Sequence, residues 1–337
     1  MRRTPYTALV NVIQAALVCS LFTVPAWADA YHVILSGSGG DAVYRAQFHD
    51  WTTRLRDVLV LEMGHAPERV FAHLEAPEDM GDAFLPVTLE AIQQRFQGLS
   101  EIVTDADEVY VYLIGHGSYI NAKSNFHIPG PDLTATELGR LLDGLHARRI
   151  VILNGASGGA GFVNVLSGPM RVVCSATKSV SEVNATEFMG HFIAGLEEGS
   201  ADTDHDGRIS FLEACEQAAE LTATWYLGES LLSTEHAILD DNADGLGSRL
   251  PLSDVDVPDS GGVFDGNLAS QCFIKDFQFP PEVPQDLIDT YLDAIDRVYE
   301  LKQKKATLDA EAYYDALVEL LVRAAQANRE IRRLTES

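Results

Sequence analysis

Apolar residues follow two different patterns in the first two thirds of the chain. Runs of consecutive apolar residues, typical of strands buried on both faces, lie at residues 31–35, 69–73, 108–114, 149–153 and 171–176. Between these runs, apolar residues recur at helical spacing, as in Phe48, Trp51 and Leu55. The alternation predicts an α/β fold, a three-layer sandwich in which helices cover both faces of a mostly parallel sheet.

One helix start carries a specific signal. Thr134 stands before an apolar series at helical spacing, and Glu137 follows three residues later. A Thr and a Glu at this spacing can satisfy each other's backbone N–H groups. We therefore expect a helix to begin directly after Thr134.

The last third of the chain has a different composition. Residues 250–284 are rich in Asp, Ser, Gly and Pro, which predicts a linker or a long surface excursion. Residues 285–337 then carry two amphipathic patterns, which predict a C-terminal helical hairpin. Two arrangements remain open for this hairpin: it packs on the main domain of residues 29–249, or it offers its apolar stripe to a partner.

Residues 1–28 have the pattern of a secretory signal peptide. Arg2 and Arg3 precede an apolar stretch, and residues 26–28 form a small-x-small cleavage site. We therefore expect an exported protein, periplasmic or secreted. No later apolar run is long enough to cross a bilayer, so no stable membrane span is expected after cleavage.

The chain is strongly acidic. Its formal net charge is −26, and removal of residues 1–28, which hold two Arg and no acid, makes it −28. A charge of this size repels nucleic acid and anionic membrane surfaces. It suits a protein that meets cations, and no nucleic-acid partner is expected.

The acidic residues include one specific motif, residues 202–213, which matches the EF-hand calcium loop. Loop positions 1, 3, 5, 6, 7, 9 and 12 are held by Asp202, Asp204, Asp206, Gly207, Arg208, Ser210 and Glu213. The expected ligands are carboxylate oxygens, the Arg208 carbonyl, Ser210 directly or through water, and two oxygens of Glu213. Calcium is therefore the expected cofactor, held between helices at about residues 185–198 and 210–226.

A second acidic stretch matches the calcium loop only in part. Asp240, Asn242, Asp244 and Gly245 fall at positions 1, 3, 5 and 6, but position 12 is Pro251, which has no ligating side chain. Three interpretations stay open: a degenerate second site, a loop that pairs with the first one, or an Asx-rich surface turn.

Possible chemistry lies at two strand ends. One run ends in Gly115-His116-Gly117, and another continues into a Gly-rich turn at residues 154–159. Their order resembles the caspase/legumain clan of cysteine peptidases, where a His-Gly closes one strand and the catalytic Cys closes the next. The resemblance covers residues 31–245, including the acidic loop and the stretch 234–245. It implies a caspase-like sheet with His116 as the matching histidine.

The resemblance fails at the nucleophile. The catalytic Cys position falls on Ala156, whose methyl group cannot attack a carbonyl. The resemblance therefore does not carry cysteine-peptidase activity to this chain. Whether Ala156 is natural or replaces a cysteine is left open by the sequence.

Ser157 offers another nucleophile. Residues 155–159 match G-x-S-x-G directly after an expected strand, a turn that exposes a catalytic hydroxyl in serine hydrolases. A base is also needed, and His116, His191 and His236 are the candidates. The alternative is a Gly-rich turn that lets the backbone pass close to a neighbour.

Three functions follow from these patterns. The first is a calcium-binding protein with a peptidase-like fold that binds a peptide or protein partner without cleaving it. The second is a hydrolase that uses Ser157 with His116. The third is a structural or assembly protein that acts through the hairpin of residues 285–337.

Overall fold

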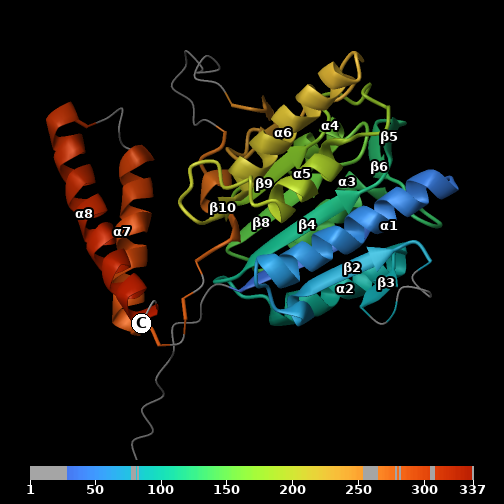
Figure 1. The fold of residues 1–337 in the computed structure, drawn as a ribbon. Helices are drawn as coiled ribbons and strands as arrows, with labels where there is room; N and C mark the ends of the chain where they lie inside the picture. The colour runs from blue at the N-terminus through green and yellow to red at the C-terminus, as the bar shows by residue number, and fades with distance from the viewer. Residues whose placement is uncertain are drawn as a thin grey trace, which may run out of the picture.

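The computed structural model describes residues 29–76, 81, 83–252, 265–277, 279–280, 282–303 and 308–335. Its centre is an eight-stranded, mostly parallel sheet (Figure 1). The strands, in their order across the sheet, are β12 (Ser248–Arg249), β11 (Ile238–Asp240), β9 (Arg171–Ser175), β8 (Arg149–Asn154), β4 (Glu108–Ile114), β1 (Ala30–Ser36), β2 (Val70–Leu74) and β3 (Phe84–Pro86). Strands β11 and β12 run antiparallel to their neighbours, and the other six are parallel. The mixed α/β fold with a mostly parallel sheet is confirmed.

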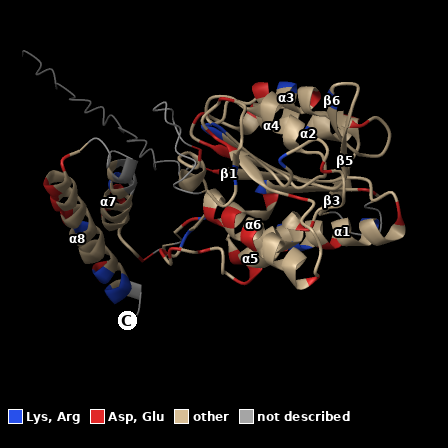
Figure 2. Cartoon of the chain, turned by 90° about the horizontal axis from the view of Figure 1, so that it is seen from above, with Lys and Arg blue, Asp and Glu red and all other residues tan. Residues whose placement is uncertain are grey.

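Helices cover both faces of the sheet (Figure 2). One face holds α1 (Ala42–Asp57), α5 (Phe188–Glu197) and α6 (Phe211–Gly228), and the other holds α2 (Leu89–Ile102), α3 (Ala135–Asp143) and α4 (Ala160–Leu166). Short helical turns lie at Val58–Glu62, Pro67–Arg69 and Ala269–Gln271. Each face has its own apolar core, because side chains alternate across every strand.

The five strands expected from apolar runs agree with β1, β2, β4, β8 and β9 to within one residue at each end. The capping box at Thr134 is also confirmed: its hydroxyl accepts from the Glu137 N–H, and Glu137 accepts from the Thr134 N–H. The shorter strands were not predicted. They include a small sheet of β5 (Gly117–Ile120), β6 (Lys123–Phe126) and β7 (Leu133–Thr134), whose two to four residues are too few for a period.

The stretch that composition marks as a linker contributes a strand to the α/β unit. Strand β13 (Phe273–Lys275) follows Cys272, and the side chains of Cys272 and Ile274 are buried in the core. Residues 253–264 of the expected linker lie outside the described residues. The linker pattern therefore covers a segment that is partly built into the fold.

A buried polar network joins this segment to the amino ends of the strands. Arg149 donates to Glu108 at 2.9 Å and to the Gln271 carbonyl at 2.5 Å. The Tyr110 hydroxyl donates to Glu108 at 2.8 Å and lies 3.2 Å from the Phe273 carbonyl. The charges of Glu108 and Arg149 are thus paired where the main chain of residues 271–273 crosses the sheet edge.

The C-terminal hairpin consists of α7 (Gln285–Gln303) and α8 (Ala310–Thr335). Its apolar core is centred on Tyr291, Ala294, Ala324 and Ala327, and Phe277 packs against it. On α8, a second row of apolar side chains is exposed: Tyr314, Val318, Leu321 and Val322. No helix among the described residues is long and apolar enough to cross a bilayer, and the expected signal peptide, residues 1–28, lies outside them.

Replacing Glu108 with Ala should lower the free energy of unfolding by about 3–5 kcal/mol, because Arg149 would keep a buried charge without its carboxylate. The matched control is Asp143→Ala, which breaks the Arg171 ion pair at a carboxylate whose side chain is 69% exposed. That loss should be below ~1 kcal/mol. Urea denaturation measures both, and equal losses would contradict this assignment.

Candidate functional site

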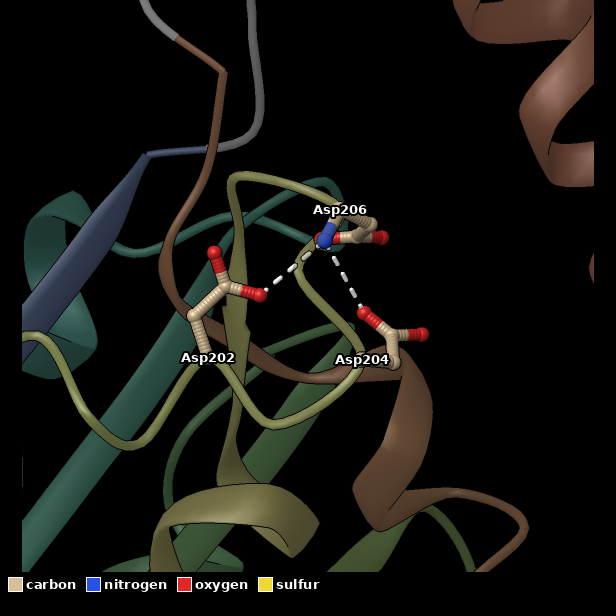
Figure 3. A group of neighbouring side chains, drawn as sticks. All are labelled: Asp202, Asp204 and Asp206. Carbon is tan, nitrogen blue, oxygen red and sulfur yellow. Dashed lines mark hydrogen bonds between the residues drawn. The ribbon is translucent and has the colours of Figure 1, made fainter.

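The loop between α5 and α6 brings three carboxylates together. Ligand oxygens of Asp202, Asp204 and Asp206 all lie within 4.8 Å of one another. The Asp206 N–H donates to Asp202 at 3.0 Å and to Asp204 at 3.1 Å, so these side chains turn into the loop (Figure 3). Gly207 has φ +92°, which favours glycine, and its N–H donates to Asp202 at 3.0 Å. The loop thus presents a concave group of acidic oxygens.

Ser210 and Glu213 close this loop onto helix α6. The Ser210 hydroxyl accepts from the Glu213 N–H, and Glu213 accepts from the Ser210 N–H, which forms a capping box. The other carboxylate oxygen of Glu213 accepts from the N–H groups of Thr203 and Asp204, at 3.2 and 3.3 Å. Glu213 therefore already faces the first half of the loop. As a bidentate ligand it would exchange these donors for the ion.

The helices that flank the loop begin later than expected. Helix α5 starts at Phe188 rather than at residue 185, because the Glu235 carboxylate accepts from the Glu187 and Phe188 N–H groups. Helix α6 starts at Phe211 and ends at Gly228, two residues beyond the expected end. The helix–loop–helix order agrees with the expectation.

The loop is joined to the rest of the protein by a two-stranded sheet. Strand β10 (Ile209–Ser210) pairs antiparallel with β13, with Ile209 opposite Lys275 and Ser210 opposite Phe273. The Phe211 N–H also donates to the Cys272 carbonyl at 2.7 Å. Because β13 belongs to the polar network at Arg149 and Tyr110, the loop backbone is coupled to the amino edge of the large sheet.

Arg208 makes a second connection through its side chain. Its guanidinium stacks on Phe273 at 3.8 Å and lies 4.8 Å from the centre of the Phe277 ring. Phe277 contacts Tyr291 of helix α7 edge-on, with 5.0 Å between the ring centres. The residue predicted to offer only a backbone oxygen thus also links the acidic loop to the hairpin core.

The two strand-end turns meet at the opposite edge of the sheet. The Ser157 hydroxyl donates to the Gly117 carbonyl at 3.3 Å and accepts from the Gly117 N–H at 3.4 Å. Its side chain is buried, so the hydroxyl is engaged with backbone and shielded from solvent. His116 packs edge-on against Tyr44 and Phe48, with ring centres 4.7 and 5.0 Å away. Burial lowers the pKa of His116, and the neighbouring His127 acts in the same direction.

Ala156 occupies a closed position between these turns. It is buried, and its N–H donates to the Asn154 side chain at 3.0 Å. A Cβ built on Gly117 would lie 3.4 Å from the Ala156 methyl, so the turn after His116 passes directly over it. The free cysteines in the described part of the chain, Cys174, Cys215 and Cys272, are all buried.

A cavity of about 700 Å³ lies beyond the carboxyl end of β9. Its walls come from Ala176, from helix α6 and from residues 231–237 and 249–251. His236, which lines it, lies 2.6 Å from Glu182, and the Glu182 carbonyl accepts from the Gly158 N–H at 2.7 Å. The candidate base His236 is therefore paired with a carboxylate whose backbone is bonded to the 155–159 turn.

Glu235 is the buried acid of this cavity. Burial raises its pKa to about 7, although the N–H groups at the start of α5 favour its charged form. The Glu182–His236 pair and the cap formed by Glu235 were not predicted as site features. Their partners are 54 and 48 residues apart along the chain, and no local pattern marks such pairs.

The acidic loop and the strand-end turns lie at opposite edges of the sheet. Arg149 begins β8 at the edge joined to β13, whereas Ser157 follows the carboxyl end of the same strand. The neighbouring strand β4 has seven residues, which corresponds to roughly 20 Å at the usual rise. An ion held by Asp202 and Asp204 is therefore too far from His116 to contact a group bound there.

Compared with known families and with curated proteins, the chain matches no family model and no curated protein. The likeness to caspases and legumains thus rests on the motifs at His116 and Ala156 and on the stretch 202–245.

Replacing Glu235 with Gln should reduce the pH dependence of stability between about pH 4.5 and 7. The folded-state pKa of about 7 lies above the ordinary value of 4.5, so the native protein binds the extra proton in this window. Wild-type stability therefore falls as the pH rises, by up to ~1.4 kcal/mol per unit from this group. Denaturant titrations of both proteins at pH 5, 6, 7 and 8 measure the difference. A stability difference that stays constant over this range would contradict the assignment.

Proposed function

We propose that this protein is an exported, calcium-binding member of the caspase/legumain-like α/β architecture that binds a peptide or protein partner without cleaving it. The observation that carries the calcium part is the convergence of Asp202, Asp204 and Asp206 within 4.8 Å, in a loop closed by Glu213. Three carboxylates at this separation repel one another, and a bound cation removes the repulsion. The EF-hand spacing of the loop favours an EF-hand site.

The donor set favours calcium over magnesium. The loop offers side-chain carboxylates, the Arg208 carbonyl and the Ser210 hydroxyl, all of them oxygen donors. Six to eight oxygens in flexible geometry suit Ca²⁺, whereas Mg²⁺ requires a near-ideal octahedron and keeps several waters. Extracellular sites of this type bind at about 10⁻⁴–10⁻³ M, which suits an exported protein.

The ion would act on the fold rather than on a reaction. Its loop bonds to β13 through β10 and contacts Phe277 through Arg208, so ordering the loop stabilises both connections. Ligand binding to the native state stabilises it by mass action. Calcium would thus hold the segment 272–277, and with it the base of the hairpin, against the α/β unit.

The strand-end turns support binding rather than catalysis. Ala156 stands where the clan places its thiol, and the Ser157 hydroxyl is bonded to the Gly117 backbone. The cavity beyond β9 is large enough for an apolar side chain, and His236 and Glu235 add polar groups to its wall. Ligands of open α/β sheets gather at the carboxyl ends of strands, which is where this cavity lies. We therefore place the peptide or partner site there.

Calcium should raise the melting temperature, and Asp204→Asn should abolish most of the rise. At a calcium concentration 100-fold above Kd the stabilisation is ~2.7 kcal/mol, or roughly 5–10 °C. Differential scanning calorimetry with calcium and with chelator measures it. The control is Asp105→Asn, an exposed acid outside the loop, which should keep the full rise.

An equal calcium response in Asp204→Asn and wild type would overturn the assignment of the ion to this loop. A wild-type melting temperature that is insensitive to millimolar calcium would have the same consequence.

The chain should show no covalent labelling by a fluorophosphonate probe and no cleavage of a peptide library, with calcium or with chelator. Ser157→Ala should behave like wild type in both assays, because the wild-type hydroxyl is buried and bonded to backbone. Labelling that disappears in Ser157→Ala would establish a serine hydrolase instead. Cleavage that depends on His116 would likewise reject the non-catalytic function.

A further inference from the structure

Asp240, the last residue of β11, is a buried carboxylate without a protein partner in the described part of the chain. The residue is fully buried, and neither of its two oxygens has a hydrogen-bond donor. A buried ionised carboxylate left in this state costs several kcal/mol. Such a group requires a ligand of opposite charge, or it takes up a proton.

The neighbouring acids do not share this condition. Asp241 accepts from the Gly266 N–H at 2.9 Å and from the Ala269 N–H at 2.8 Å. Asp265 accepts from the Asp241 N–H at 3.0 Å and from the Ser248 hydroxyl at 2.6 Å. These two carboxylates hold the segment 265–269 in place, so their structural roles are accounted for.

Neighbouring negative charges increase the free-energy cost of burying the Asp240 carboxylate. Asp240 is fully buried, and the carboxylates of Asp265 and Asp244 are close enough to repel its charge. The Ser167 hydroxyl and the Gly245 N–H come close to this carboxylate, but neither makes a hydrogen bond of normal geometry to it. Its surroundings thus combine several acids with few donors, which is the environment of an oxygen-ligated cation.

The backbone after Asp240 repeats the conformation of the first acidic loop. Position 4 has a positive φ in both, +59° at His205 and +68° at Ala243, and position 6 is a glycine at +92° and +75°. The position-5 N–H donates to the position-3 side chain in both, at 3.1 Å to Asp204 and at 2.9 Å to Asn242.

The next turn is also the same. The position-7 N–H donates to the position-5 carboxylate at 2.7 Å, from Arg208 to Asp206 and from Leu246 to Asp244. The loops differ at position 1, where Asp202 accepts two backbone N–H groups and Asp240 accepts none. They also differ at position 12, where Pro251 replaces Glu213.

We propose that residues 240–246 form a second divalent-cation site for Ca²⁺, with side-chain oxygens of Asp240, Asn242 and Asp244 and the Leu246 carbonyl as ligands. Pro251 at position 12 has no carboxylate. Asp265, from another segment, supplies the missing negative charge, and it accepts from the hydroxyl of Ser248 at position 9. This site is independent of the first loop, so either one can fail without the other.

Isothermal titration of the chelator-treated full chain with Ca²⁺ tests the proposal by counting ions. Wild type should bind two, Asp204→Asn should lose the first site, and Asp240→Asn should lose the second. Asp244→Ala should also weaken the second site at least 10-fold. This side chain is exposed, so its removal leaves the core intact.

A wild-type stoichiometry of one, lost in Asp204→Asn and unchanged in Asp244→Ala, would overturn the second site. One ion lost in Asp240→Asn and retained in Asp204→Asn would support it while rejecting the first.

Thermal unfolding separates ligation from folding. In the presence of chelator, Asp240→Asn should be at least as stable as wild type, because burial of a neutral amide costs less free energy than burial of an unpartnered carboxylate. Asp241→Asn is the matched control: each oxygen of Asp241 accepts from one backbone N–H, and the amide keeps only one of these acceptors, so it should destabilise with or without calcium. A marked loss of stability in Asp240→Asn with chelator present would show that the carboxylate has a structural role and would contradict the proposal.

Discussion

Burial of the large sheet on both faces is the constraint on which the other features depend. The central strands β1, β4 and β8 are buried along almost their whole length, so the middle of the sheet has no surface open to a ligand. The candidate sites therefore lie at the two edges where strands begin and end. At the carboxyl edge lie His116, the Ser157 turn and the cavity. At the amino edge lies the Glu108–Arg149 network, to which β13 connects the acidic loop. The proposed partner site and the proposed cation site thus lie at different ends of one sheet.

The amino-acid pattern predicts the parts of the fold that depend on local periodicity. Strands of five to seven apolar residues were predicted to within one residue, because continuous burial marks them in the sequence. Strand β13 was not, since its three residues follow a Pro- and Asp-rich stretch and are fixed by distant partners. The later start of α5 has a similar cause, because its cap comes from Glu235, far along the chain. Long-range hydrogen bonds leave no periodic signal.

The candidate site also combines features that the local sequence predicts with features that depend on distant residues. The acidic loop was predicted residue by residue, since all of its candidate ligands lie within twelve consecutive positions, and the structure brings Asp202, Asp204 and Asp206 together. The side-chain role of Arg208 was not predicted, because Phe273 and Phe277 are far along the chain and only the fold brings them to the guanidinium. At the other edge, the G-x-S-x-G pattern left two interpretations open, an exposed Ser157 or a Gly-rich turn close to a neighbour, and the structure buries the hydroxyl against Gly117. A short motif identifies a turn, and its environment decides whether the side chain is accessible.

The central claim is that calcium acts through the loop on the segment 272–277. Hydrogen exchange measured by mass spectrometry, with calcium and with chelator, tests it most directly. Calcium should slow exchange at the amides of 203–211 and, through the β10–β13 bonds, at those of 272–277, with little change at 154–159 on the opposite edge. Unchanged exchange at 203–211 in saturating calcium, or protection of that loop without any at 272–277, would contradict the account.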